Sequence, residues 1–171
     1  HEEQSERLIH GMGDVHPPAL KLLLLERLST LAPWEETRSV LSSSGSEAME
    51  TALKTSELST GRSGIIAFEG AYHGLTLGSL AVTARPDFRD PFRARLHQGV
   101  SFAPYPETDE EAVTALSEVQ RLLSEGGVGA VVVEPVQGRA GVRIPPPGFL
   151  GRLAELPRAE GSLLLFDGIF T

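Results

Sequence analysis

A short run of valines, Ala130-Val131-Val132-Val133, decides the fold class of this chain more than any other segment. An unbroken run of β-branched residues without polar alternation is typical of a strand that is buried on both faces of a parallel sheet. Similar short apolar runs at residues 38–41, 65–68, 100–102 and 163–166 are predicted to be further strands. Parallel neighbours need a crossover connection, which is usually a helix, so helices are expected between the strands.

Helical patterns do separate these runs, at residues 19–31, 47–59, 76–83, 108–125 and 149–160. The clearest helix starts with a capping box, Thr108 with Glu111, and ends before Gly126-Gly127. Its apolar stripe consists of Ala112, Val113, Leu116, Val119 and Leu123. The helix at 19–31 is so rich in leucine that little of its surface is expected to face water. Strands that alternate with helices predict an α/β fold, a three-layer α/β/α sandwich with a mostly parallel sheet.

Composition excludes several classes of function. The 171 residues carry a formal net charge of −8, which argues against nucleic acid or an anionic membrane as a partner. No apolar stretch is long enough to span a bilayer, and no secretory signal pattern opens the chain, so a cytoplasmic protein is expected. The absence of cysteine excludes disulfides and thiolate metal sites. No metal site is expected, because His1, His10, His16 and His97 lack zinc spacing and are interpreted as solvated or capping residues.

The segment Ser42-Ser43-Ser44-Gly45-Ser46-Glu47-Ala48 joins a predicted strand to a predicted helix. The first N–H groups of a helix have no partner within the helix and lie at the positive end of its dipole, so they suit a phosphate. Gly45 would let the backbone approach an anion closely, and Ser46 adds a hydroxyl donor. A plain N-cap is the alternative interpretation. A nucleotide loop of the Walker type is excluded, because no Gly-Lys-Ser/Thr follows the glycine.

Polar residues also follow three other predicted strands directly. Tyr72-His73 comes after residues 65–68, Glu134 after the valine run, and Asp167 after residues 163–166. Ligands in parallel sheets collect beyond the carboxyl ends of the strands, so these groups are expected at one edge. Each has a simpler interpretation: a core aromatic for Tyr72, a surface acid for Glu134 and a helix cap for Asp167.

Several segments together resemble the class III pyridoxal-phosphate aminotransferases, the group that includes ornithine, 4-aminobutyrate and other ω-amino-acid transaminases. Their order and spacing match over nearly the whole chain. The segments that carry the resemblance are Ser44-Gly45-Ser46-Glu47-Ala48, Phe68-Glu69-Gly70-Ala71-Tyr72-His73-Gly74, Val133-Glu134-Pro135-Val136-Gln137-Gly138 with Pro145-Pro146-Pro147-Gly148-Phe149, and Phe166-Asp167-Gly168-Ile169, together with His16-Pro17 and Leu31-Ala32-Pro33.

The resemblance implies a cofactor, pyridoxal 5'-phosphate, and a role for each matching residue. Gly45 and Ser46 would hold its phosphate. Asp167 would pair with the pyridine nitrogen and keep it protonated, which makes the ring an electron sink and makes Asp167 the catalytic residue of this chain. The remaining family positions are Tyr72, stacked on the ring with His73 beside it, Ile169 on the other face, and Glu134 in the polar shell.

The resemblance also implies a function for the intact protein. It would be a transaminase that moves an amino group between an amino acid or ω-amine donor and a 2-oxo acid, through the pyridoxal and pyridoxamine forms of the cofactor, in a homodimer. An aminomutase or racemase of the same family is one alternative. A non-catalytic module that keeps the fold is another.

The family's fold, the fold-type I large domain, is expected here only in part. Residues 1–18 are interpreted as an irregular N-terminal segment and residues 19–171 as a partial cofactor-binding domain, whose second half and small domain lie outside the chain. The Schiff-base lysine is expected beyond the strand at 163–166, because neither Lys21 nor Lys54 matches its position. The chain alone is therefore predicted to be inactive.

The chain departs from the family pattern at three positions. Arg139 stands where many members have an acid, Gly168 where they have Glu after the Asp, and Phe170 where Gln is common. A guanidinium favours a carboxylate or phosphate partner, so Arg139 is predicted to contribute to recognition of the substrate or of a partner loop rather than to cofactor chemistry. Arg85, Arg89, Arg93 and Arg95 lie in a polar stretch and are interpreted as a solvated loop face, with a subunit contact as the sharper alternative.

Overall fold

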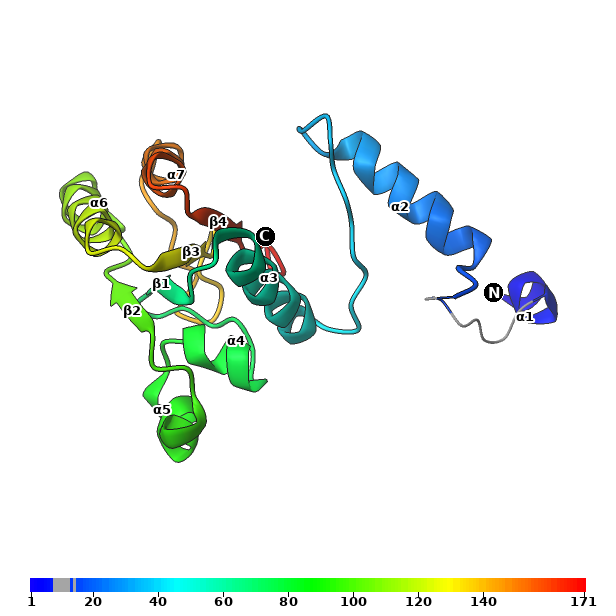
Figure 1. Ribbon diagram of the computed structural model, residues 1–171, viewed down its shortest axis with the longest axis horizontal. Helices are drawn as coiled ribbons and strands as arrows, with labels where there is room; N and C mark the ends of the chain where they lie inside the picture. Colours follow the sequence, from blue (N-terminus) through cyan, green and yellow to red (C-terminus); the bar gives the residue numbers. More distant parts are fainter. Residues whose placement is uncertain (8–12, 14) are drawn as a thin grey trace. The chain divides into compact units, whose positions relative to one another are not determined.

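The computed structural model describes residues 1–7, 13 and 15–171, which form two compact units. The first unit, His1–Leu41, contains α1 (Glu2–Arg7) and α2 (Ala19–Leu31). The second unit, Ser42–Thr171, contains the sheet (Figure 1). Its elements are α3 (Gly45–Thr60), β1 (Gly64–Phe68), α4 (Leu77–Val82), α5 (Pro86–Arg89), η1 (Asp90–Arg95), β2 (Val100–Ala103), α6 (Asp109–Ser124), β3 (Val128–Val133), α7 (Phe149–Ala159) and β4 (Leu163–Phe166).

In the first unit, the bounds of α2 agree with the prediction, but its expected burial was wrong. None of its residues is buried, because no other layer of this unit covers the helix. The exposed leucines are Leu20, Leu22, Leu23, Leu24, Leu28 and Leu31. The segment expected to be irregular contains α1, whose Arg7 pairs with Glu3 one turn earlier at 2.8 Å. The division expected at residue 18 stays a prediction for the whole protein, and His10 lies outside the described residues.

The strand predicted at residues 38–41 was wrong. The backbone there is irregular, and Val40 is 73% exposed. A strand is stable only when its backbone groups pair with a neighbour, and these residues belong to the first unit, whereas all four strands of the sheet belong to the second. The apolar pair Val40-Leu41 was too short a signal for a buried strand.

The sheet of the second unit has the order β2-β1-β3-β4, and every pair is parallel. Register aligns the carboxyl ends of neighbouring strands, with Phe68 opposite Ala103 and Val133 opposite Phe166. The valine run therefore occupies an inner strand that is buried along its whole length, as predicted. Polar residues that follow β1, β3 and β4 consequently meet at one edge of the sheet.

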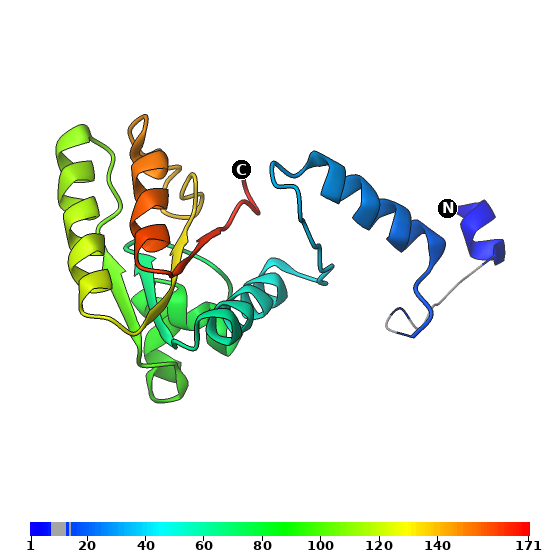
Figure 2. The same ribbon diagram turned by 45° about the horizontal axis from the view of Figure 1, so that its top comes forward.

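Helices cover both faces of this sheet, which confirms the predicted three-layer fold (Figure 2). Alternate strand residues point to opposite faces. Ile66 and Phe68 pack with α6 and α7 in the larger core cluster. Ala67 and Val132 pack on the other face with α3 and α4.

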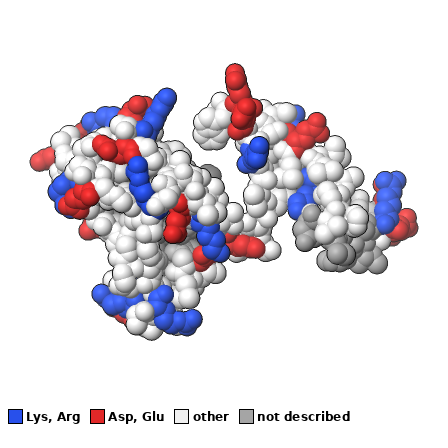
Figure 3. All heavy atoms as spheres, viewed as in Figure 1, with Lys and Arg blue, Asp and Glu red and all other residues white. Residues whose placement is uncertain are grey.

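Local details differ from the sequence expectation in two places. The capping box of α6 is present, but Val113 of its predicted stripe is 58% exposed, and Ala115 and Leu122 are buried instead. The polar stretch after Arg85 forms α5 and η1 rather than a loop, and Lys and Arg side chains gather over these elements (Figure 3). Not all of its arginines are solvated, because the Arg89 guanidinium lies 4.6 Å from the centre of the Phe102 ring.

Candidate active site

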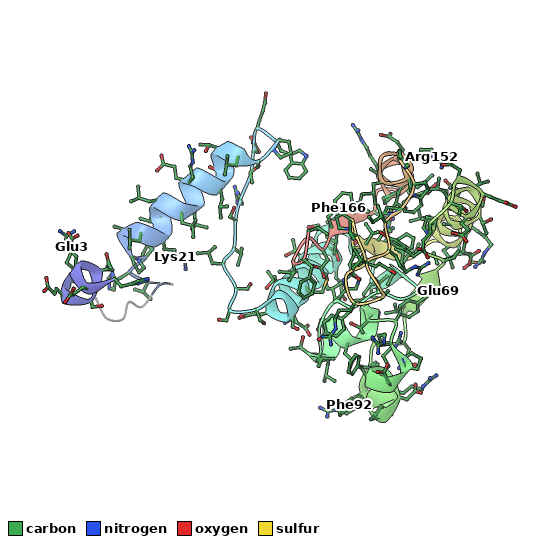
Figure 4. The ribbon with its side chains drawn as sticks, turned by 180° about the vertical axis from the view of Figure 1, so that it is seen from behind. Glu3, Lys21, Glu69, Phe92, Arg152 and Phe166 are labelled. Carbon is green, nitrogen blue, oxygen red and sulfur yellow. The ribbon has the colours of Figure 1, made fainter. Side chains whose placement is uncertain are left out.

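A pocket of about 140 Å³ lies at the carboxyl edge of the sheet. Its walls come from the start of α3, the loop after β1 and the segment after β4. Figure 4 marks Glu69 and Phe166, which lie at the ends of β1 and β4. The residues that line the pocket are Ser44, Gly45, Ser46, Tyr72, His73, Gly74, Asp167, Ile169 and Phe170.

The start of α3 forms one wall and offers free donors. Ser44 is the N-cap, since its Oγ accepts a hydrogen bond from the Glu47 N–H at 3.2 Å. The Glu47 carboxylate accepts in turn from the Ser43 N–H at 2.7 Å. The capping interpretation is therefore correct for Ser44, but it uses only one of the helix's first N–H groups. The N–H groups of Gly45 and Ser46, at the first two helical positions, have no partner within the helix and remain available to an anion.

The loop after β1 packs closely on this helix start, and two glycines permit the approach. Gly74 has a φ of 124°, and a Cβ there would overlap the Ser46 hydroxyl. A Cβ on Gly45 would lie 3.0 Å from Ile169 Cγ1, so the segment after β4 also touches the helix start. The Ser46 Oγ accepts from the Leu75 N–H at 3.3 Å, which leaves its hydroxyl proton free to donate.

Asp167 and His73 form a largely buried pair that lines the pocket. His73 Nδ1 lies 2.8 Å from Asp167 Oδ2, and the two side chains are 0% and 11% exposed. The other Asp167 oxygen accepts from the Ile169 N–H at 3.2 Å, so Asp167 forms a local turn and does not cap a helix. His73 is fixed on its backbone side as well, because its N–H donates to Thr83 Oγ1 at 2.9 Å.

Glu134 holds two loops together behind this pair. Its Oε1 accepts from the Tyr72 N–H at 2.9 Å, and its Oε2 accepts from the Gly138 N–H at 3.2 Å. The residue is only 4% exposed, so the surface-acid interpretation was wrong. Burial raises the pKa of the Glu134 carboxyl, and the charge of Asp167 adds to this, although the two N–H donors and His73 oppose it.

Tyr72, which lines the pocket, stacks with Arg139, which does not line it. The Arg139 guanidinium carbon lies 4.2 Å from the centre of the Tyr72 ring, within cation–π range. The Tyr72 ring is also packed edge-on against Phe88, with ring centres 5.9 Å apart. Tyr72 is half-buried and borders the pocket, so it is not a plain core residue.

The structure adds four polar residues to which the sequence analysis assigned no role. Thr83, Tyr105 and Gln137 are buried, and Tyr105 donates its hydroxyl to the Glu134 carbonyl at 3.1 Å. Burial, together with the charge of Glu134, raises the pKa of Tyr105 to about 12. Glu50 accepts from the Thr76 hydroxyl and from the Gly78 and Ser79 N–H groups at the start of α4. Burial would raise the pKa of Glu50, but these three hydrogen bonds, led by that of Thr76, lower it. Only the long-range fold brings these groups together, so no local pattern indicates them.

Neither lysine is among the residues that line the pocket. Lys54 borders a different pocket, of about 220 Å³, beside the last turns of α3. Among residues 1–7, 13 and 15–171, no three His, Cys, Asp or Glu side chains are arranged to hold a metal ion. In the same residues, no helix is long and apolar enough to cross a membrane.

This fold and pocket define a class of domain. The carboxyl edge of this parallel sheet brings together the free N–H groups at the start of α3, an aromatic ring and a largely buried carboxylate. Such a site suits a phosphorylated aromatic cofactor. Comparison with known proteins gives the family: the profile described as Aminotransferase class-III matches residues 1–171, so the chain belongs to the class-III aminotransferases. The predicted family is confirmed.

Individual relatives agree with this assignment. The chain is 34% identical to an acetylornithine aminotransferase of Methanosarcina mazei over 99% of its own length and 40% of the relative. It is 40% identical to an adenosylmethionine-8-amino-7-oxononanoate aminotransferase of Synechococcus elongatus, covering 99% of the chain and 43% of the relative. An (S)-enantioselective omega-transaminase from Thermomicrobium roseum superposes with a TM-score of 0.90 at 27% identity, over 99% of this chain and 42% of that one. The chain therefore spans about two fifths of the length of these proteins.

The residues of the pocket fit pyridoxal phosphate, the cofactor of this family. One similar structure, an amine transaminase from an uncultivated Pseudomonas species, is in the PLP-bound form; it has a TM-score of 0.78 and 26% identity, over 85% of this chain and 37% of that one. Here the free N–H groups of Gly45 and Ser46 and the Ser46 hydroxyl suit a phosphate, and the Asp167 carboxylate suits a protonated ring nitrogen. In the part of the chain that the structure describes, His73 Nε2 is the only buried side-chain polar atom without a partner, so the site has hydrogen-bonding capacity that a ligand can use.

Proposed function

We propose that the whole protein is a pyridoxal-phosphate-dependent transaminase, which moves an amino group between an amino acid or ω-amine and a 2-oxo acid. Membership of the class-III family supports this proposal. The observation that carries it is the position of the largely buried Asp167–His73 pair, 2.8 Å apart, in the same pocket as the free N–H groups at the start of α3.

Each of these groups has a separate task in the proposed reaction. Pyridoxal phosphate supplies the electron sink when it is bound. Gly45 and Ser46 would bind the phosphate through N–H and hydroxyl donors. Asp167 would hold a proton on the ring nitrogen, and His73 would fix the orientation of the Asp167 carboxylate. Tyr72 and Ile169 would bracket the ring, and Glu134 would keep the loop of Tyr72 in place through its buried hydrogen bonds.

The proposal includes features that lie outside this chain. A lysine that holds the cofactor would come from sequence not contained in these 171 residues, because neither Lys21 nor Lys54 matches the family position or lines the pocket. We also propose a cytoplasmic homodimer. Family membership supports the dimer, and the net charge of −8 is compatible with a protein that acts on small molecules rather than nucleic acid.

An absorbance experiment on the full-length protein tests the proposal. Bound cofactor should absorb in the visible range, and addition of an amino donor without acceptor should convert it stoichiometrically to the amine form. A 2-oxo acid should then restore the original spectrum. Cofactor that binds but does not respond to any amino donor would favour a non-catalytic module. A response without amino transfer to the 2-oxo acid would favour an aminomutase or racemase.

A further inference from the structure

The loop after β1 is fastened to the end of α4 by Thr83, a residue that is fully buried. Thr83 Oγ1 accepts a hydrogen bond from the His73 N–H at 2.9 Å. One residue further along the chain, the Ala84 N–H donates to the Ala71 carbonyl at 2.8 Å. The backbone on both sides of Tyr72 is therefore held by the two residues that follow α4.

The same hydroxyl also reaches the far end of this loop. Thr83 Oγ1 lies 3.1 Å from the Gly74 carbonyl oxygen and 3.0 Å from that of Ser79, so its single proton can be donated to either. The Gly74 carbonyl belongs to the same peptide group as the Leu75 N–H, which donates to Ser46 Oγ at 3.3 Å. This peptide group thus lies between Thr83 and the serine that is proposed to bind the cofactor phosphate.

The packing of α4 holds Thr83 in a fixed position. The start of the helix is tied to α3, because the Glu50 carboxylate accepts from two N–H groups at that end, at 2.7 and 3.3 Å. At the other end, Val82 is fully buried and packs with Met49 of α3 and Ala67 of β1. A helix held at both ends cannot move its last residues independently of α3 and the sheet. Thr83 therefore gives the loop after β1 a fixed point of attachment.

His73 depends on this attachment for its orientation. Its ring is buried, with Nδ1 2.8 Å from Asp167 Oδ2, and its Nε2 has no partner in the part of the chain that the structure describes. A single hydrogen bond restrains one atom of the ring, so the backbone must restrain the rest. Without the Thr83 hydroxyl, the His73 N–H would be a buried donor without an acceptor, and the backbone would shift to find one. Such a shift changes the direction from which Nδ1 meets Asp167.

We propose that Thr83 is a positioning residue for the ring nitrogen of the cofactor. The Thr83 hydroxyl fixes the backbone of His73, and the His73 ring in turn fixes the Asp167 carboxylate that would hold the ring nitrogen. Thr83 does not line the pocket, so it acts only through His73. This inference rests on the proposed transaminase function and adds to it a residue from outside the pocket.

The test measures the affinity of the cofactor-free, full-length protein for two ligands by isothermal titration calorimetry. Pyridoxal phosphate and 1-deazapyridoxal phosphate differ only at the ring nitrogen, which a C–H group replaces in the second compound. The parent should bind pyridoxal phosphate about 10- to 100-fold more tightly, the range for a hydrogen bond to a charged group. Thr83→Val keeps the shape of the side chain but removes the hydroxyl, and it should reduce this preference about fivefold, the size of one ordinary hydrogen bond. Thr83→Ser restores the hydroxyl and should keep the preference of the parent.

Ser79→Ala is the matched control. Ser79 is also fully buried in α4, but its hydroxyl donates to the Thr76 carbonyl at 3.1 Å and not to the loop that carries His73. Its removal should lower the free energy of unfolding and leave the preference between the two ligands unchanged. A purely structural role of Thr83 would likewise weaken the binding of both ligands by the same factor.

The outcomes separate this inference from the function on which it rests. An unchanged preference in Thr83→Val, or an equal loss of preference in Thr83→Ser, would overturn the inference. If Thr83→Val does not fold, Thr83→Ala removes the same hydroxyl and takes its place; failure of both variants to fold would assign Thr83 to stability alone and overturn the inference as well. A parent that binds both ligands equally would overturn both this inference and the role of Asp167. A parent that binds neither ligand would overturn the proposed function itself.

Discussion

Replacing Glu134 should reveal how strongly the candidate site depends on one buried side chain. Glu134→Ala leaves the N–H groups of Tyr72 and Gly138, two half-buried residues, without their acceptor. Each orphaned donor costs about 1–3 kcal/mol, so the free energy of unfolding should fall by about 2–6 kcal/mol. Glu134→Gln keeps one acceptor and presents its amide group to the other donor. It should therefore lose about half as much, less any relief from removing a buried charge.

The pH dependence gives a second and sharper signature. Because the pKa of Glu134 is raised above its ordinary 4.5, the folded protein binds this proton more tightly than the unfolded chain does. The stability that comes from this shift is complete below pH 4.5 and is lost as the pH rises through the raised pKa. The stability difference between the parent and Glu134→Gln should therefore shrink as the pH rises through that window.

Urea unfolding of the whole protein, followed by circular dichroism at several pH values, measures both effects. Glu155→Gln on α7 is the matched control, because Glu155 is exposed and its removal should leave the unfolding midpoint unchanged. The reasoning fails if Glu134→Ala behaves like the control. It also fails if the stability difference between the parent and Glu134→Gln grows with rising pH.

Three further predictions follow from the same contacts. Gly74→Ala should lower the free energy of unfolding in urea by at least about 2 kcal/mol, because the strain of a positive φ adds to the overlap with Ser46. Gly126→Ala is also at positive φ but has open space around it, so it should lower that free energy by about 1 kcal/mol. Equal losses in the two variants would contradict the packing described. Asp167→Asn should slow turnover of the full-length protein by about 10²- to 10³-fold, while its circular dichroism spectrum matches that of the parent. Near-normal turnover with bound cofactor would contradict the role assigned to Asp167. With an amino donor, the isolated chain should convert the cofactor no faster than free pyridoxal phosphate reacts. Turnover together with a single stoichiometric adduct on Lys21 or Lys54, trapped by borohydride, would contradict this.

The sheet and the membership of the pocket could be predicted from the sequence for one physical reason. Short apolar runs specify parallel strands, and parallel strands bring whatever follows them to a common edge. Tyr72, His73 and Asp167 follow β1 and β4 and therefore meet in the pocket, as expected, and Glu134 lies directly behind them. The start of α3 lines the same pocket, although no strand precedes it. The strand predicted at residues 38–41 was wrong, because two apolar residues do not establish that a partner strand is present.

The partners of these residues could not be predicted. That Glu134 bridges the loops after β1 and β3, or that Gln137 anchors a hairpin to Glu69, depends on how loops return across the sheet edge. No spacing in the sequence encodes such contacts. The stack of Arg139 on Tyr72 is of the same kind, because these residues are distant in sequence and meet only through the order of β1 and β3 in the sheet.

The central claim is that the pocket at the strand ends holds pyridoxal phosphate, with its phosphate at the start of α3 and its ring nitrogen at Asp167. A crystal structure of the full-length protein with the cofactor tests it most directly. The account predicts phosphate oxygens in hydrogen-bond contact with the N–H groups of Gly45 and Ser46, and the ring nitrogen in contact with the Asp167 carboxylate while His73 remains paired with it. A cofactor bound elsewhere, or bound with its phosphate away from α3, would contradict the account.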